Sequence, residues 1–419
     1  MNIAIVGAGI SGISAAYNLQ KKHTVTLIEK NKKLGGHSNT IHVKDDNSND
    51  LFIDTGFIVM NHKNYPNFSN FLKNLNVQLI KSDMSFSYSN KNTNIQYAGT
   101  LKGLLPNLRK IFSPNHYRLL YLITKYSKIL DHDFQAGKLN SSNFTIKEYL
   151  EKIHCPEFVM KNYFFPIAGA IWSCPQEEIE QYPVTSYVNF FHNHGLLQIG
   201  QREQWYTIAG GSKEYIKKFE TDFKGTIIKD AEVINIRQSD NKVILQGKHN
   251  YIQEFDLIVM ATHADETLSM LNSPTQDQQK ILSAFKYSKN QIVLHTDSNV
   301  LSKNKNIWAS WNFITSNESI DQSKESIHYY MNRLQKIKSN KEYIVSVNPP
   351  DSLKKENIIY TTEYTHPILG QDAIKMQSTL LHLNKQSRIL FCGSYFGFGF
   401  HEDGYLSGLN VSKEILKRF

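Results

Sequence analysis

The chain has 419 residues, of which 40% are hydrophobic and 20% are charged. This length favours two domains or one large split domain, and the composition supports a packed core while excluding a disordered protein. Lysine and arginine number 47 against 38 acidic residues, and the resulting net charge of +9 favours an anionic partner such as a phosphate cofactor, a nucleic acid, an acidic substrate or a membrane.

The N-terminus predicts a β-α-β unit. Residues 2–6 form a short apolar run typical of a buried parallel strand, and the loop Gly7-x-Gly9-x-x-Gly12 follows at once. Residues 13–20 then have a helical pattern. A second strand is expected over Val25–Ile28, and Glu29 follows it.

Helical periodicity and frequent aromatic residues dominate residues 63–204, including a stripe of leucines between Leu101 and Ile111. Ser113-Pro114 predicts a helix start, because serine is a capping residue and proline fits the first turn. An α/β pattern returns from about residue 205, and a terminal helix is expected from about Tyr405. Strands are predicted at 225–228, 232–236, 242–246, 255–260, 307–313, 357–364 and 388–391.

The glycine loop has the spacing of a dinucleotide-binding site. Gly7 allows a tight turn, Gly9 lets the backbone approach a pyrophosphate, and Gly12 lets the helix pack on the strand. The helix N-terminus offers unpaired amides to an anion, and Glu29 stands where a carboxylate binds ribose hydroxyls, which disfavours NADP. The alternative is a tight β-α turn without a ligand.

The segment Leu34-Gly35-Gly36-His37-Ser38, after Glu29-Lys30, resembles the extended signature of FAD-dependent oxidoreductases in the flavin amine oxidase, phytoene desaturase and protoporphyrinogen oxidase superfamily. That superfamily usually has arginine after the glycine pair, and here the residue is His37. The resemblance implies an α/β fold with a split Rossmann-like FAD-binding domain of the glutathione-reductase/amine-oxidase type and an inserted α+β substrate-binding domain. We expect the first domain to comprise 1–62, 205–265 and 386–419, and the second 63–204 and 266–385.

Further segments match the superfamily's signatures. Phe52–Phe57 resembles its strand-turn that reaches the flavin, and Ala261-Thr262-His263 resembles its second flavin-domain signature. Gly393-Ser394 departs from the usual Gly-Asp, which leaves open whether Glu402 or Asp403 replaces the aspartate. The resemblance implies FAD contacts from Gly7, Gly9, Ile10, Ser11, Gly12, Glu29, Lys30, Gly36, His37, Thr55, Gly56, Phe57, Val233, Ala261, Thr262, Gly393, Ser394, Asp403, Gly404, Tyr405 and Leu406.

A narrower resemblance covers nearly the whole chain. Its motifs are Ile171-Trp172-Ser173, residues 193–197, Gln204-Trp205-Tyr206 and residues 399–404. They are similar to a bacterial subgroup of NAD/FAD-binding, flavin-containing amine-oxidase-like proteins, and the resemblance implies an association with fatty-acyl lipid modification.

Candidate catalytic residues are His401 and Glu402, which we expect in a loop near the flavin as a base or a hydrogen-bonding group. The alternative role is turn and capping chemistry before the terminal helix, with Asp403 as the cap. The substrate-pocket candidates are Trp172, Phe191, His194, Trp205 and Phe398, with ordinary core packing as the alternative. His192 and His194 lack a third partner, so no metal site is predicted.

Residues 101–130 contain no acidic residue and carry interleaved aromatic residues. This pattern predicts peripheral contact with an anionic membrane or a lipid substrate, and a solvated helix face is the alternative. No nucleic-acid recognition module is present, so nucleic-acid binding is not expected. The basic residues are Lys102, Arg109, Lys110, Arg118, Lys125 and Lys128.

The predicted function is FAD-dependent oxidation or desaturation of a small lipophilic substrate such as a fatty-acyl chain, with O2 or a quinone as electron acceptor. Three alternatives remain open: a flavin amine oxidase, a redox-neutral FAD-dependent fatty-acid double-bond isomerase, and a non-catalytic lipid carrier of the same fold. Three cysteines cannot all pair, and no apolar run approaches the ~20 residues of a membrane span. We therefore expect a cytoplasmic protein, with any membrane contact at the inner face.

Overall fold

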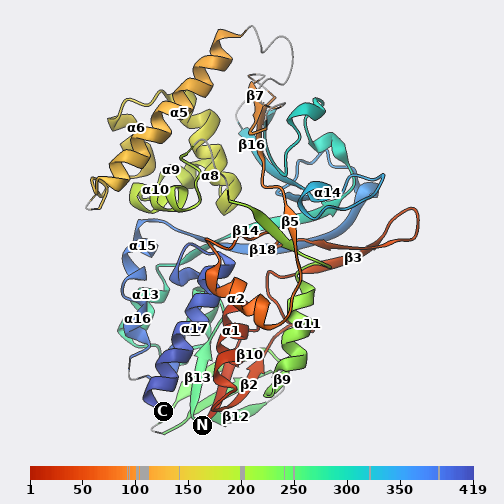
Figure 1. Cartoon of the computed structure of the whole chain (residues 1–419). Coiled ribbons are helices and arrows are strands. Elements are labelled where there is room, and N and C mark those ends of the chain that lie inside the picture. The colour runs from red at the N-terminus through yellow and green to blue at the C-terminus, as the bar shows by residue number, and fades with distance from the viewer. Residues whose placement is uncertain are drawn as a thin grey trace.

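The computed structural model describes residues 1–91, 93, 95–100, 103, 113–140, 142–198, 203–239, 241–248, 251–319, 322–385 and 387–419. The predicted leucine stripe from Leu101 to Ile111 lies outside these residues, as do Lys102, Arg109 and Lys110. Figure 1 shows two halves: the lower contains both termini and a parallel sheet, and the upper contains a helical lobe beside a large antiparallel sheet.

The lower half is built on a five-stranded parallel sheet of order β19-β13-β1-β2-β9. The central strands β1 and β13 consist almost wholly of buried apolar residues, because a parallel sheet is covered on both faces. Its strands come from all three segments expected in the FAD-binding domain, and the mixed α/β fold with a parallel Rossmann-like core is confirmed. The strands are β1 (Asn2–Val6), β2 (Thr24–Ile28), β9 (Thr226–Ile228), β13 (Leu257–Met260) and β19 (Ile389–Phe391).

Two helices from opposite ends of the chain pack closely on one face of this sheet (Figure 1). They are α1 (Ile10–Leu19) and α17 (His401–Arg418). A Cβ added at Gly408 of α17 would lie 2.2 Å from the carbonyl oxygen of Ser11, so only glycine permits this approach. Also in this half are α2 (Pro66–Asn74), α11 (Lys213–Asp222), α12 (Ala264–Met270), α13 (Gln276–Leu282), α15 (Gln371–Gln377), α16 (Leu380–Leu383) and the antiparallel strands β10 (Val233–Gln238), β11 (Val243–Gly247) and β12 (Ile252–Phe255).

The upper half contains a seven-stranded sheet of order β18-β14-β17-β16-β15-β6-β7. Every neighbouring pair is antiparallel except β15 and β6. Two further antiparallel pairs are β3-β4, which projects from the side of the molecule, and β5-β8, which joins distant segments where the halves meet (Figure 1). The bounds are β3 (Thr40–Lys44), β4 (Asp50–Asp54), β5 (Leu79–Ser82), β6 (Phe86–Asn90), β7 (Ile95–Ala98), β8 (Trp205–Ile208), β14 (Lys286–His295), β15 (Trp311–Ser319), β16 (Gln322–Tyr330), α14 (Met331–Leu334), β17 (Ile344–Val347) and β18 (Ile358–Ile368).

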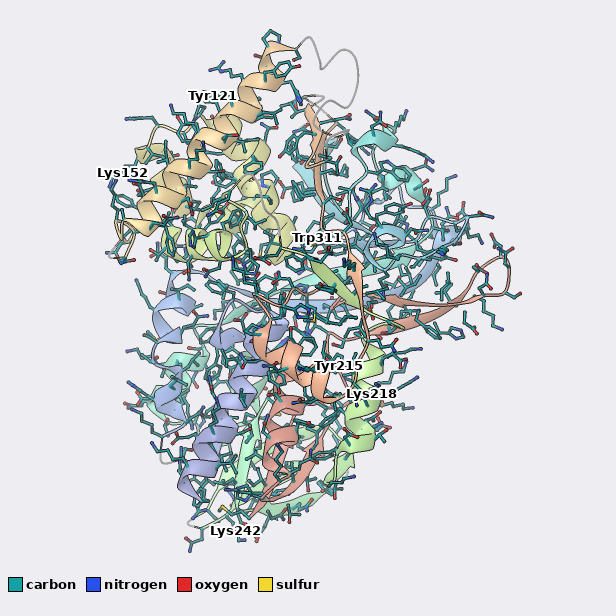
Figure 2. The ribbon with its side chains drawn as sticks, viewed as in Figure 1. Tyr121, Lys152, Tyr215, Lys218, Lys242 and Trp311 are labelled. Carbon is teal, nitrogen blue, oxygen red and sulfur yellow. The ribbon has the colours of Figure 1, made fainter. Side chains whose placement is uncertain are left out.

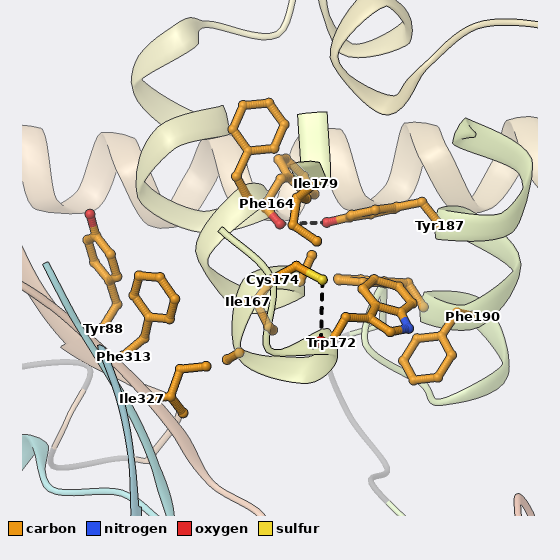
Figure 3. Close-up of a cluster of buried hydrophobic side chains, with 14 of the residues drawn as sticks. Tyr88, Phe164, Ile167, Trp172, Cys174, Ile179, Tyr187, Phe190, Phe313 and Ile327 are labelled. Carbon is orange, nitrogen blue, oxygen red and sulfur yellow. Dashed lines mark hydrogen bonds between the residues drawn. The ribbon is translucent and has the colours of Figure 1, made fainter. Parts of the chain in front are cut away.

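Helix α5 of the helical lobe begins at Pro114 with Ser113 as the N-cap residue, which confirms the predicted start. Its core is aromatic: Tyr187 donates a hydrogen bond to the carbonyl oxygen of Phe164 at 2.7 Å, and Phe313 of β15 belongs to the same cluster (Figure 3). The elements are α5 (Pro114–Gln135), α6 (Ile146–Lys152), α7 (Glu157–Val159), a π-helical segment (Met160–Phe164), α8 (Phe165–Trp172), α9 (Gln176–Glu180) and α10 (Val184–Asn193).

The structure corrects several expectations, including the strand predicted at 307–313, because β15 begins only at Trp311. Helix does not dominate throughout 63–204, because β5, β6 and β7 occupy parts of residues 79–98 and pair with strands far along the chain. The single strand expected at 255–260 is interrupted at Asp256, whose carboxylate accepts a hydrogen bond from the Asn2 amide at 2.7 Å. The terminal helix begins at His401 rather than near Tyr405, because the Asp403 carboxylate accepts from the Phe400 amide and closes the first turn.

All three cysteines are buried and unpaired: Cys155, Cys174 and Cys392. Burial raises the pKa of the Cys155 and Cys174 thiols to about 12, so both stay neutral at physiological pH. Among the described helices, none combines the length and apolar character needed to cross a bilayer.

Candidate active site

A cavity of about 1640 Å³ extends through both halves of the molecule. Its wall includes Glu29 at the end of β2, the glycine loop after β1, and Leu120 of α5 in the helical lobe. Ligand pockets commonly measure about 300–1,000 Å³, so this cavity is larger than a pocket for one small ligand.

The glycine loop has the geometry of a phosphate cradle. Gly7 has a φ of +97°, and a Cβ there would lie 2.9 Å from the carbonyl oxygen of Ala261. A Cβ at Gly12 would lie 1.9 Å from the carbonyl oxygen of Gly7, whereas a Cβ at Gly9 would meet nothing within 4 Å. Gly9 therefore borders open space at the N-terminus of α1, where backbone amides favour an anion. These features fit the pyrophosphate of a dinucleotide.

Glu29 is held firmly in place at the end of β2. Its carboxylate accepts hydrogen bonds from the Ala8 amide at 2.9 Å and from the Asn31 amide and side chain at 2.9 and 2.8 Å. The neighbouring Lys30 is paired with Glu266 at 2.6 Å. Because a carboxylate has about four acceptor sites, Glu29 retains capacity for a ribose hydroxyl.

The second glycine pair lies against the first loop. Gly36 has a φ of +57°, and a Cβ there would lie 3.2 Å from the Cα of Gly9. His37 follows, with its ring centroid 4.8 Å from that of Tyr364. Its Nε2 atom is buried and has no hydrogen-bond partner among the described residues. Burial, and then the neighbouring histidines, hold the pKa of His37 well below its usual value.

The segment Thr55-Gly56-Phe57 forms the next part of the wall. A Cβ at Gly56 would lie 2.0 Å from the carbonyl oxygen of His37, and the Phe57 amide donates to that same oxygen at 2.9 Å. The Phe57 ring stacks on the His401 ring, with centroids 3.9 Å apart. The segment therefore joins the glycine pair to the start of α17.

His401 lines the cavity in the first turn of α17. Its Nε2 lies 3.1 Å from both the Ser38 hydroxyl and the Tyr215 hydroxyl, and burial lowers its pKa to about 3. The imidazole is therefore neutral at physiological pH, and one ring nitrogen is already engaged.

Glu402 lies outside the cavity wall, and its catalytic role stays a prediction. Its carboxylate accepts from the amides of Asn67 and Phe68 at 3.0 and 2.9 Å, and from the Asn67 side chain at 2.7 Å. These are N-terminal groups of α2, so Glu402 caps that helix and ties it to α17.

Five of the residues predicted to contact FAD lie outside the cavity wall, and some of them pack between helices. A Cβ at Gly404 would lie 2.7 Å from Cγ2 of Ile10, and the Tyr405 ring packs 5.1 Å from the Phe71 ring. Burial raises the pKa of Asp403, which caps α17, to about 7. The predicted residues outside the wall are Gly12, Asp403, Gly404, Tyr405 and Leu406. Those that line it are Gly7, Gly9, Ile10, Ser11, Glu29, Lys30, Gly36, His37, Thr55, Gly56, Phe57, Val233, Ala261, Thr262, Gly393 and Ser394.

Four of the five predicted substrate residues line the cavity: Trp172, His194, Trp205 and Phe398. The fifth, Phe191, is fully buried behind Trp172. His194 stacks on Phe190 at 3.8 Å and contacts its carbonyl oxygen through Nδ1, and burial lowers its pKa to about 4.

His192 and His194 do not share a partner. His192 bonds the Asp131 carboxylate at 2.5 Å, whereas His194 contacts Phe190. The described residues contain no group of three side chains placed to hold a metal ion.

Sequence reasoning missed a further part of the wall, which belongs to β15, β16, β18 and α5. Strand β18 contributes Tyr360 and the continuous run from Thr362 to Pro367, and no local sequence signal marked them as part of a cavity. Trp311 of β15 lies where the two halves meet (Figure 2). No motif marked Trp311, Tyr329 or Leu120, because only the tertiary fold brings them to the cavity.

Comparisons with known proteins agree with this geometry. The profile of the family described as flavin containing amine oxidoreductase matches residues 10–416. A comparison with curated protein sequences gives no match.

Similar solved structures show the same fold. They include putrescine oxidase bound to putrescine (12% identity, TM-score 0.71, covering 100% of each chain). A CLA-producing fatty acid isomerase from P. acnes has 13% identity and a TM-score of 0.69, covering 100% of this chain and 98% of that one. Cyclohexylamine oxidase from Brevibacterium oxydans IH-35A has 13% identity and a TM-score of 0.70, covering 100% and 99%.

Proposed function

The chain belongs to the flavin-containing amine oxidoreductase family and is an FAD-dependent oxidoreductase, and from this premise we propose that it oxidises or desaturates a lipophilic substrate such as a fatty-acyl chain. The observation that carries the proposal is the character of the cavity beyond the cofactor loop. There the wall is formed by apolar and aromatic side chains of α5, α8 and β15, including Leu120, Ile167 and Trp311.

The carboxylates of the wall already have partners, which favours a substrate without positive charge. Glu29 is hydrogen-bonded at the nucleotide end, and each of the others has a lysine partner. An ammonium group would therefore find no unpaired carboxylate in the described wall. The lysine-paired residues are Glu203, Glu220, Glu232, Glu266 and Glu363.

Bound FAD supplies the hydride acceptor, flavin N5. The Gly9 loop and the N-terminus of α1 hold its diphosphate, and Glu29 holds a ribose hydroxyl. His401 remains neutral and is fixed by Ser38 and Tyr215, so it forms a rigid wall with Phe57. The apolar inner wall excludes water and aligns a substrate C–H bond. We further propose that O2 or a quinone reoxidises the cofactor.

A second candidate is a redox-neutral isomerisation of a fatty-acid double bond. It is supported by the fold shared with the fatty acid isomerase and by the same apolar cavity. Turnover in the absence of any electron acceptor would favour this candidate over net oxidation. Oxidation of an amine, as by a flavin amine oxidase, is a further outcome that the same experiments detect.

We also propose that α5 contacts an anionic membrane at the inner face of the cell. Tyr117 and Tyr121 are 47% and 67% exposed, and Tyr121 lies on the outer side of the helix (Figure 2). The basic residues Arg118, Lys125 and Lys128 share this outer side of α5, while Leu120 on the same helix lines the cavity. Such a helix would bring the cavity close to lipid substrates.

The substrate proposal is tested by narrowing the inner cavity. Leu120→Trp is expected to leave FAD bound while reducing flavin reduction by long-chain substrates by about tenfold or more, because the added rings occupy the chain's space. The matched control is Gln135→Trp, on the exposed face of the same helix. Equal activity of the two variants on long-chain substrates would contradict the proposed site.

A further inference from the structure

Three histidines from distant parts of the chain meet in one part of the cavity wall. His37 follows the second glycine pair, His263 follows β13, and His366 lies on β18. The ring centroid of His37 lies 6.0 Å from that of His263 and 5.5 Å from that of His366. No step of the proposed oxidation uses these side chains.

This histidine cluster adjoins the phosphate cradle. Gly36, the residue before His37, approaches Gly9 so closely that a Cβ would lie 3.2 Å from the Gly9 Cα. Thr262, the residue before His263, bounds Gly7: a Cβ there would lie 3.0 Å from Cγ2 of Thr262. Two of the histidines therefore directly follow residues that contact the glycine loop.

The positive charge of the wall comes from lysines, several of which have acidic partners. The described wall contains lysines but no arginine, and His37 stands where the superfamily usually has arginine. Lys30 is paired with Glu266, and Lys229 is paired with Glu220. Lys32 and Lys33 also line the wall, at exposed positions. A diphosphate bound at Gly9 would be neutralised by backbone amides, by any wall lysine that reaches it and by whatever charge the histidine cluster acquires.

The imidazoles have hydrogen-bonding capacity to spare. His37 Nε2 has no partner among the described residues. His366 Nδ1 accepts from the Asn290 amide group at 3.0 Å, and Asn348 fixes that amide's orientation by donating to its oxygen at 2.8 Å. The neutral His366 ring therefore carries its proton on Nε2, as a donor. His263 Nδ1 bonds the Thr365 hydroxyl at 3.1 Å.

The surroundings favour neutral rings when no anion is bound. Burial lowers the pKa of all three histidines, that of His366 to about 4. The charged groups facing the cluster are few and partly cancel. His37 faces His401 and Tyr364, His263 faces Asp265, Glu266, Lys30 and Tyr287, and His366 faces His263.

We propose that His37, His263 and His366 clamp the diphosphate of FAD, and that at least one of them takes up a proton as the cofactor binds. An adjacent anion stabilises the charged imidazolium, so proton uptake accompanies binding. FAD then binds more tightly as pH falls, by about tenfold per pH unit for each proton taken up within the titrating range. This inference rests on the cofactor and is independent of the substrate.

Isothermal titration of the full-length apoprotein with FAD at about pH 7, in HEPES and in Tris buffer, measures the uptake, because protons released by the two buffers contribute different heats. We expect uptake of about one proton, and the same uptake with ADP-ribose, which has the diphosphate but no flavin. His37→Gln and His366→Gln should each reduce the uptake and flatten the pH dependence of affinity. The control is His382→Gln, an exposed histidine on α16, which should behave as wild type.

Equal heats in the two buffers with the wild-type protein would overturn the proposal, whether or not the variants fold. Unchanged uptake in both folded variants would also overturn it. Uptake with FAD but not with ADP-ribose would assign the proton to the flavin side and refute the diphosphate clamp. None of these results depends on turnover, so they are separate from any failure of the substrate proposal.

Discussion

Replacing Gly9 and Gly12 by alanine, one at a time, should separate folding from cofactor binding. At Gly9, φ is −71° and ψ is −177°, which alanine adopts readily, and its Cβ would meet nothing within 4 Å. Gly9→Ala should therefore keep or slightly raise the stability of the apoprotein, by about 0.4–1 kcal/mol, because the unfolded chain loses conformational freedom.

The same methyl group should weaken the binding of FAD. It would occupy the space through which a diphosphate approaches the backbone, and we expect a loss of affinity of about tenfold to a hundredfold, equivalent to ~1.4–2.8 kcal/mol.

Gly12→Ala should behave in the opposite way. Its Cβ would lie 1.9 Å from the Gly7 carbonyl oxygen, so α1 must shift away from β1. Overpacking of this kind costs about 1–3 kcal/mol or more. Thermal unfolding of both apoproteins and titration with FAD, followed by quenching of flavin fluorescence, measure the two effects. The reasoning is refuted if Gly9→Ala destabilises the apoprotein as much as Gly12→Ala, or if it binds FAD with wild-type affinity.

Three other predictions concern capping, pH and the surface. Glu402→Ala should lower the free energy of unfolding by about 1–2 kcal/mol through loss of the α2 cap, whereas a loss of substrate oxidation without any loss of stability would support its catalytic role. His295 is fully buried, and burial lowers its pKa to about 4. In the unfolded chain the pKa is about 6.5, so the free energy of unfolding should fall by ~3 kcal/mol as the pH drops from about 6.5 towards 4. Denaturant titrations of wild type and His295→Gln across that range check this; identical pH profiles would contradict it. Lys125→Glu with Lys128→Glu should reduce sedimentation with anionic vesicles at low salt, and equal binding of wild type to neutral and anionic vesicles would count against the α5 surface.

Local sequence patterns predicted the glycine-loop region of the lower half well. β1, the glycine loop and the entry into α1 follow one another within a few residues, and each glycine's role depends on neighbours that the motif itself specifies. The start of α5 at Ser113-Pro114 was also visible, because capping is a local property.

Features that depend on contacts between residues far apart in the sequence could not be predicted from local patterns. Strands β5 and β6 lie in a region read as helical, and they form because β8 and β15 supply their partners. Glu402 was read as catalytic because its local motif lies near the flavin end, yet its partners are the amides of α2. The histidine cluster likewise needs three distant segments to meet.

The most direct test of the central claim is anaerobic mixing of the FAD-loaded protein with fatty-acyl substrates and with small amines, followed by the visible absorbance of oxidised flavin. The account predicts that an acyl substrate bleaches this absorbance, that amines such as putrescine and cyclohexylamine do not, and that Leu120→Trp slows the bleaching. Bleaching by the amines without any response to acyl chains would contradict the account.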